Sequence, residues 1–321
     1  MKFNSESLTI ANSDRYIHTE ADIISEKAKA ISEKLGIVKE GLYSGHSTMT
    51  NYIYTDAPID KMVNVLVTYD ALFYLDDVFG EDTRTGQLPD AQKIIEIWKG
   101  EKMYSSANIE IQKLYESIGY VSRRLRKDCS KVFFEKFTTT ITDHLSNSLT
   151  SKAYQTVDDY TKIRLATSGM YIPIDLIEYV HSIYVDEELR NTENLFLKQL
   201  CEQCALIGAL SNDLFSYSKE KHSDYNLINA FLLTKEASNY HEAVTKSIAK
   251  VNSIHAHFKA TLSKARQAVT SLPANEQLII DRYLNSLEVI VASSYHWQKS
   301  TNRYYHHENV FEDMKASVLE I

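Results

Sequence analysis

The sequence predicts an all-α fold, and two observations carry that prediction. Glycine and proline contribute only 9 and 4 of the 321 residues, about 4% of the chain where roughly 12% is usual. Folds rich in β-structure need these residues in their many tight turns, so their scarcity favours helices. Apolar residues also recur at the i, i+3, i+4 and i+7 spacing of amphipathic helices over most of the chain.

That spacing predicts helical segments over 21–35, 60–78, 91–102, 132–151, 187–220 and 237–297. Helices this long are stabilised mainly by packing against one another. No repeat with a period of about 20 to 50 residues occurs, and no linker rich in proline, glycine and serine divides the sequence. We therefore predict a single domain over residues 1–321.

Charge and hydropathy exclude several classes of protein. The formal net charge is −8, which disfavours proteins that coat nucleic acid or an anionic membrane, since both need excess lysine and arginine. No stretch approaches the roughly 18 apolar residues of a membrane span, and the first residues lack the apolar core of a secretory signal. We expect a cytoplasmic protein without a nucleic-acid partner or a membrane span.

A first acidic cluster follows a strongly apolar segment in the run FYLDDVFGE. Asp76 and Asp77 come after three helical turns of apolar and aromatic residues, and Glu81 follows just beyond Gly80. Carboxylates this close repel one another unless a cation relieves the repulsion, and oxygen ligands in small number suit Mg²⁺. Taken alone, the cluster is somewhat better explained as a helix end with solvated acids.

A second polar cluster lies in the run SNDLFSYSKE, where Asn212, Ser216 and Glu220 are spaced at i, i+4 and i+8. On a helix this spacing drifts by only about 40° per step, so an amide oxygen, a hydroxyl and a carboxylate form one stripe. Three oxygen donors on one side match one face of an octahedral Mg²⁺ ion. The alternative is a solvated face, but the preceding run CALIGAL is apolar on every side and predicts a buried helix.

The two clusters together resemble the paired metal motifs of class I terpene synthases, the aspartate-rich DDxx(x)D/E motif and the NSE motif. The resemblance covers nearly the whole chain and identifies it as similar to the microbial enzymes with a single α domain. It implies a helical bundle around a central apolar cavity and three Mg²⁺ ions, with Mn²⁺ as an alternative ion. The implied metal ligands are Asp76, Asp77, Glu81, Asn212, Ser216 and Glu220.

Two further segments fit the same family. The run YTKIRLATSG resembles the helix break whose arginine senses the diphosphate; this implies Arg164 as sensor, with Thr167 and Ser168 in the linker and effector positions. The run WQKSTNRYYHHE resembles the family's terminal Arg-Tyr pair and implies a catalytic role for Arg303 and Tyr304. All four motifs occur in the order that the family requires.

The chemistry implied by the family also needs groups that bind the diphosphate and groups that shelter a carbocation. Lys219 would add positive charge beside the leaving group. Aromatic faces stabilise a cation without offering a nucleophile. The candidates by position are Tyr69, Phe73, Phe79 and Trp297, and core packing is the alternative explanation for each.

The resemblance implies a lyase, a terpene cyclase that ionises an acyclic isoprenyl diphosphate, farnesyl or geranylgeranyl, and cyclises the cation to a hydrocarbon or alcohol. We favour the C15 substrate. Two alternatives stay open: a trans-prenyltransferase-like enzyme, although the NSE motif stands where a second aspartate-rich motif is needed, and a non-catalytic binder of prenyl diphosphates. The sequence leaves open whether the protein is a homodimer. We expect Asp76→Asn and Glu220→Ala to abolish turnover and Arg164→Ala to cause a large loss of turnover, with the fold kept in each.

Overall fold

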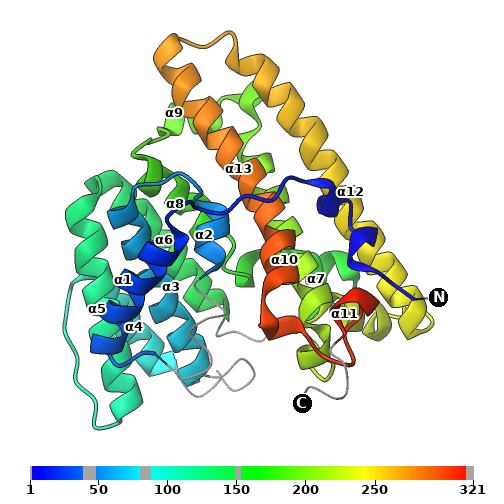
Figure 1. Cartoon of the computed structure of the whole chain (residues 1–321), viewed down its shortest axis with the longest axis horizontal. Helices are drawn as coiled ribbons and strands as arrows, with labels where there is room; N and C mark the ends of the chain where they lie inside the picture. Colours follow the sequence, from blue (N-terminus) through cyan, green and yellow to red (C-terminus); the bar gives the residue numbers. More distant parts are fainter. Residues whose placement is uncertain (1, 39–47, 80–87, 149–152, 316–321) are drawn as a thin grey trace. The chain divides into compact units, whose positions relative to one another are not determined.

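The computed structural model describes residues 2–38, 48–79, 88–148 and 153–315 (Figure 1). Helices dominate these residues, and the β-pairing found among them is an isolated parallel bridge between Phe3 and Phe311. The all-α prediction is therefore confirmed. Contacts divide the chain into two compact units: unit 1 comprises Met1–Tyr16, Lys152–Ile174 and Val185–Ile321, and unit 2 comprises Ile17–Ser151 and Asp175–Tyr184.

Unit 2 is organised around α3 (Ile59–Phe79), which is apolar on every side and is buried along most of its length. It packs against α1 (Ala21–Lys34) and α5 (Ile109–Asp128), while α4 (Leu88–Lys99) packs against α5 and α6 (Lys131–Ser148). The short α2 (Met49–Ile53) also contacts α3. Helix α8 (Tyr171–His181) carries the chain from unit 1 into unit 2.

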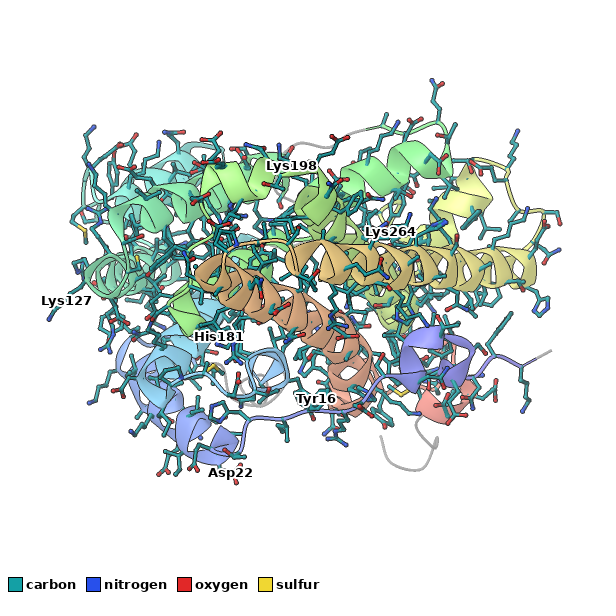
Figure 2. The ribbon with its side chains drawn as sticks, turned by 90° about the horizontal axis from the view of Figure 1, so that it is seen from above. Tyr16, Asp22, Lys127, His181, Lys198 and Lys264 are labelled. Atoms are coloured by element: carbon teal, nitrogen blue, oxygen red, sulfur yellow. The ribbon has the colours of Figure 1, made fainter. Side chains whose placement is uncertain are left out.

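Unit 1 is organised around α10 (Leu197–Glu220), whose apolar stretch is almost completely buried. This helix packs against α12 (Tyr240–Val269), α13 (Ala274–Ser300), α7 (Val157–Thr167) and α11 (Leu227–Leu233), as Figure 1 shows. The short α9 (Glu187–Asn191) precedes it. Charged side chains such as Lys198 and Lys264 are exposed and point away from the helix packing (Figure 2).

Two of the predicted helical segments are interrupted. The segment predicted over 187–220 divides into α9 and α10, because Phe196 adopts the left-handed conformation with φ of 52° at the start of α10. The segment predicted over 237–297 divides into α12 and α13 at Pro273, which directly precedes the first residue of α13. Proline lacks the N–H that a continuous helix would need there. Helices α2, α5, α7, α8 and α11 lie outside the predicted segments.

The beginning of the chain packs against its last described residues within unit 1. The Ser5 hydroxyl donates to Asp313 Oδ2 over 2.5 Å, and the Ser5 backbone N–H donates to Asp313 Oδ1 over 2.9 Å. The Glu312 N–H donates to the Phe3 carbonyl over 2.9 Å. Phe311 is fully buried, with its ring centroid 5.0 Å from that of Phe215 on α10. We call these contacts the terminal clasp; they fix the segment after α13 against α10.

We expect His255, on the buried side of α12, to make unit 1 sensitive to acid. Its side chain accepts or donates a 2.8 Å hydrogen bond with Thr9, and burial lowers its pKa from 6.5 to about 4, with Lys259 adding to the shift. Below about pH 6.5 the unfolded chain therefore takes up a proton that the folded chain does not, so the free energy of unfolding falls with decreasing pH, by up to about 3 kcal/mol near pH 4.

Urea unfolding at pH 7 and pH 5 checks this expectation, with His255→Gln as the comparison because glutamine does not titrate in this range. The loss of stability between the two pH values should be smaller in the variant. An equal loss in both proteins would contradict the assignment.

Candidate metal and diphosphate site

The stripe predicted on α10 exists in the structure and ends the buried part of that helix. The Ser216 hydroxyl lies 2.8 Å from Glu220 Oε2 and 2.8 Å from the Asn212 carbonyl oxygen. Ser216 is 1% exposed, whereas Asn212 and Glu220 are half-buried. The Asn226 side-chain amide, just before α11, donates to Glu220 Oε2 over 3.1 Å. The Ser216 hydroxyl and the Glu220 carboxylate therefore lie together along one side of the last turns of α10, beginning one turn after Asn212.

Two other predicted residues meet at the Asn212 side chain. Its Nδ2 donates to the Tyr304 hydroxyl over 2.8 Å, and Arg164 Nη2 donates to its Oδ1 over 3.4 Å. Because the donor and the acceptor end of the amide each have a partner, its orientation is fixed. The structure thus brings together α7, α10 and the residues after α13 within unit 1.

Arg164 is held by a residue that the sequence reasoning missed, Asp213. Arg164 Nε donates to Asp213 Oδ1 over 2.8 Å, and the Tyr160 hydroxyl donates to Asp213 Oδ2 over 2.5 Å. Asp213 is 0% exposed. The sequence does contain a signal for this residue, because Asp213 directly follows Asn212 in an apolar helix. It lies about 100° around the helix from the ligand stripe. A carboxylate buried at such a position requires a buried partner.

Burial shifts the ionisation of these acids. It raises the pKa of Glu220, the charge of Asp213 adds to the rise, and Arg164 opposes it. Burial also raises the pKa of Asp213, opposed by Arg164 and by the hydroxyl of Tyr160. A carboxylate whose ionised form is disfavoured by burial gains from a further positive charge nearby. The electrostatics of this site therefore favour a cation at Glu220.

The predicted helix break after Arg164 lies where the sequence placed it. Helix α7 ends at Thr167, Ser168 caps it, and Gly169 takes the left-handed conformation with φ of 70°. The Ser168 hydroxyl accepts the Met170 N–H over 3.3 Å. Helix α8 begins two residues after Gly169. Thr167 and Ser168 are half-buried, as is Arg164 one turn earlier.

The predicted Arg-Tyr pair belongs to a short 3₁₀ turn, η5 (Asn302–Tyr304), which follows α13. Tyr304 is 4% exposed and Arg303 is half-buried. The Trp297 ring meets the Tyr304 ring edge to face with centroids 6.0 Å apart, and Asn309 donates to the Tyr304 carbonyl over 2.7 Å. Lys219, also predicted to bind substrate, is exposed on α10.

The first acidic motif belongs to unit 2, at the end of α3. Asp76 is half-buried and Asp77 is exposed. One to two turns earlier, the Tyr69 and Phe73 rings lie with centroids 6.1 Å apart; the buried Tyr69 hydroxyl has no hydrogen-bond partner among the described residues. Glu81 and the side chain of Phe79 lie outside the described residues, so both stay predictions.

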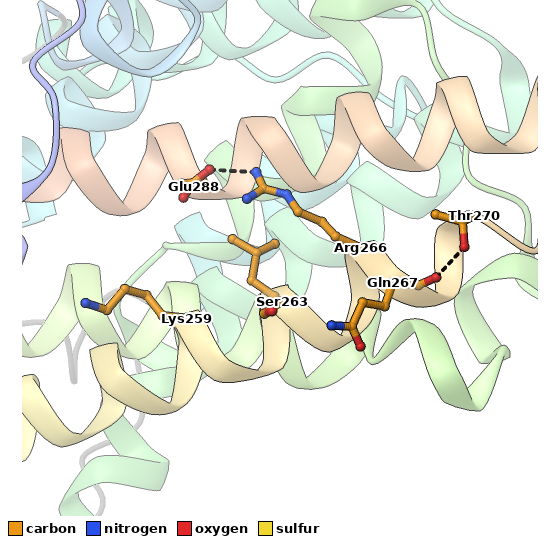
Figure 3. Close-up of a pocket in the computed structure, with 7 residues that line it drawn as sticks. Lys259, Ser263, Arg266, Gln267, Thr270 and Glu288 are labelled. Carbon is orange, nitrogen blue, oxygen red and sulfur yellow. Dashed lines mark hydrogen bonds and ion pairs between the residues drawn. The ribbon is translucent and has the colours of Figure 1, made fainter.

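Two other features of unit 1 are separate from this network. A hollow between α12 and α13 is lined by Lys259, Arg266 and Glu288, among others, and Arg266 is paired with Glu288 over 2.7 Å (Figure 3). Ligand atoms of His306, His307 and Glu308 lie within 4.8 Å of one another, but Glu308 is paired with Lys221 over 2.5 Å. Neither contains a predicted site residue.

Comparison with known proteins gives one family match and several relatives. The model of the family "Terpene synthase family 2, C-terminal metal binding" matches residues 68–257. A (+)-T-muurolol synthase from Streptomyces clavuligerus that cyclises (2E,6E)-farnesyl diphosphate is 30% identical over 115 residues, which are 35% of this chain and 27% of that protein. Terpene synthase 1 from Physarum polycephalum is 22% identical over 88% of this chain and 87% of its own.

The share of each relative that this chain matches varies widely, whereas the solved structures match over nearly their whole length. This chain spans 27% of the Streptomyces relative and 38% of Terpene synthase 2 from Dictyostelium purpureum, which is 25% identical over 39% of this chain. A point variant of cucumene synthase matches with a TM-score of 0.80 at 16% identity, covering 91% of this chain and 99% of that one. Germacradien-4-ol synthase from Streptomyces citricolor matches with a TM-score of 0.77 at 14% identity, covering 92% of this chain and 99% of that one. These likenesses show the fold.

In the described residues, no helix has both the length and the apolar character of a membrane span.

Proposed function

Because this chain belongs to the terpene synthase family with a C-terminal metal-binding region, we propose that it is a class I terpene cyclase. Its substrate is an acyclic isoprenyl diphosphate, and its products are a cyclic terpene and inorganic diphosphate. We propose that residues 1–321 act as one catalytic domain. The Streptomyces relative is named for cyclising farnesyl diphosphate, which supports the C15 substrate over the C20 one.

The observation that carries the proposal is the convergence on Asn212. A ligand-type oxygen stripe on α10, an arginine from α7 and a tyrosine from the turn after α13 meet at one side chain. Oxygen ligands beside a guanidinium suit a site for a metal diphosphate, in which both metal and arginine contact the anion. A protein with a net charge of −8 can bind a polyanion there because bound metal supplies positive charge.

The donor set fits Mg²⁺. Asn212, Ser216 and Glu220 offer an amide, a hydroxyl and a carboxylate oxygen, all hard ligands, and burial of Glu220 favours a nearby cation. We propose these three residues as ligands, together with Asp76, Asp77 and Glu81, for three Mg²⁺ ions or for Mn²⁺ in their place. Bound Mg²⁺ would supply Lewis acidity to the departing diphosphate.

The residues of the chain itself would bind, orient and shelter the substrate. Arg164 and Arg303 would hold diphosphate oxygens with their guanidinium groups, and Lys219 would add a point charge. Asn212, fixed by Tyr304, would keep its oxygen on the ligand side. Trp297, buried against Tyr304, would offer its aromatic face to a cation without adding a nucleophile. Tyr69 and Phe73 are the corresponding candidates in unit 2.

Incubation with Mg²⁺ and geranyl, farnesyl or geranylgeranyl diphosphate, followed by gas chromatography of the volatile products, tests the proposal. We expect cyclic C15 products and release of inorganic diphosphate with farnesyl diphosphate. A longer prenyl diphosphate formed on addition of isopentenyl diphosphate would show a prenyltransferase instead. Thermal stabilisation by Mg²⁺ and prenyl diphosphate without diphosphate release would show a non-catalytic binder.

A further inference from the structure

We propose that Asp213 is the positioning residue for Arg164, holding the guanidinium so that its Nη end faces Asn212 and the diphosphate. The inference rests on the proposed function, since it assigns a role within the same site. Asp213 would touch neither metal nor substrate and would act through Arg164.

The hydrogen bonds of Asp213 fix its carboxylate completely. Oδ1 accepts Arg164 Nε over 2.8 Å, while Oδ2 accepts the Tyr160 hydroxyl over 2.5 Å and the Leu227 backbone N–H over 3.1 Å. These three donors come from α7 and from the first residue of α11. Both oxygens are engaged in a side chain that is 0% exposed, so turning the carboxylate would break these bonds, and the guanidinium is anchored to it through Nε.

Within the described part of the chain, the hydrogen bonds that hold Arg164 use only two of the three nitrogen atoms of its guanidinium group. Its hydrogen bonds to the described residues use Nε for Asp213 and Nη2 for Asn212. The Nη1 end therefore stays open to an anion that binds beside Asn212. Its side chain keeps 20% exposure although its partner has none, which is consistent with one end anchored in the interior and the other facing a ligand.

Stability alone explains this ion pair poorly. Replacing a buried pair of charges by apolar residues of similar volume is often neutral or stabilising, so burying a charge pair has a cost in desolvation. A role in binding explains the pair better, because an arginine that Asp213 already holds in place loses less conformational entropy when the diphosphate binds.

The same aspartate also supports the far end of the stripe. The Asn226 side-chain amide donates to the Asp213 carbonyl oxygen over 2.7 Å and to Glu220 Oε2 over 3.1 Å. Because this second link runs through the backbone carbonyl, it is kept in any side-chain variant of Asp213. Substitution of the carboxylate therefore leaves the link to Glu220 in place and alters only the bonds to Arg164, Tyr160 and Leu227.

The test is a thermodynamic cycle on binding of inorganic diphosphate with Mg²⁺, measured by calorimetry on wild-type protein, Asp213→Asn, Arg164→Ala and the double variant. We expect each single variant to weaken binding at least about 10-fold, and the double variant to bind no more weakly than Arg164→Ala. Losses that multiply in the double variant would overturn the proposal, because Asp213 would then act independently of Arg164. Steady-state kinetics should show the Asp213→Asn defect chiefly in kcat/KM.

Tyr160→Phe is the matched control, since it removes one partner of Asp213 and keeps the bond to Arg164. We expect a lower melting temperature with diphosphate affinity within about 2-fold of wild type. An affinity loss as large as that of Asp213→Asn would show that general loosening of the network is responsible, and would overturn the inference.

Arg164→Lys tests the idea even if Asp213→Asn fails to fold. Lysine carries its donors on one nitrogen, so an ammonium drawn to Asp213 cannot also present a separate, fixed nitrogen beside Asn212 as the guanidinium fork does. We expect binding as weak as in Arg164→Ala, and wild-type affinity would contradict the proposal. Wild-type protein that neither binds diphosphate nor forms a terpene would refute the proposed function itself, whereas wild-type behaviour of Asp213→Asn would refute this inference alone.

Discussion

Glu220→Ala is expected to reduce turnover of farnesyl diphosphate below detection while leaving the helical circular dichroism signal unchanged. Removing a residue that only hydrogen-bonds to a metal ligand already lowers metal affinity or activity about 10–100-fold. Glu220 is proposed as a direct ligand, so its loss should cost more. The fold should tolerate the change because each hydrogen-bond partner of Glu220 keeps another acceptor. Ser216 still reaches the Asn212 carbonyl, and Asn226 still reaches the Asp213 carbonyl.

Glu202→Ala provides the control, since Glu202 is an exposed glutamate on the same helix. Its turnover and its thermal stabilisation by Mg²⁺ with inorganic diphosphate should match wild type, and Glu220→Ala should lose both. A wild-type rate in Glu220→Ala would remove the metal assignment from the stripe on α10. Asp76→Asn applies the same test to the first motif.

Arg164→Ala is expected to lose both turnover and stability. The sequence alone led us to expect an intact fold, but the structure pairs Arg164 with the fully buried Asp213. Removing one partner of a buried ion pair costs about 3–5 kcal/mol because the other charge is left uncompensated. Kinetics and urea unfolding of the same preparation measure the two losses.

The double variant Arg164→Ala with Asp213→Asn separates them. Neutralising Asp213 should recover most of the stability, and turnover should stay low because the diphosphate still lacks its arginine. Arg266→Ala, which removes an exposed arginine from the hollow between α12 and α13, should leave turnover unchanged. Unchanged kinetics in Arg164→Ala would mean that another residue binds the leaving group.

The fold class and the family could be predicted because both depend on regular patterns. Scarce glycine and proline and the helical spacing predicted the all-α fold, and the four motifs predicted the terpene synthase family, which the family match confirms. The helix break at Ser168 and Gly169 was predictable for the same reason, since a glycine follows the end of the motif. Which residues act as metal ligands and which bind substrate stays a prediction.

Details that depend on tertiary packing could not be read from the pattern. Phe196 starts α10 from a left-handed conformation that bulky residues rarely adopt, so no local signal marked that boundary. Helix α7 has apolar and polar residues on all sides and lies outside the segments found by periodicity. Its aspartates, Asp158 and Asp159, lie within its first turn, and Thr156 provides the cap. The role of Asp213 required knowing that Arg164, 49 positions earlier, reaches it.

The terminal clasp has a consequence for the order in which unit 1 assembles. Ser5 and Asp313 are 308 positions apart, and closing a flexible loop of that length costs about 5 kcal/mol in chain entropy. Because the few contacts of the clasp offset only part of that cost, we expect it to close after α10, α12 and α13 have packed and shortened the effective loop. Phe3 and Ser5 are therefore among the last residues of unit 1 to find their partners, and removing either these residues or residues 311–313 takes the same support from the segment that carries Tyr304.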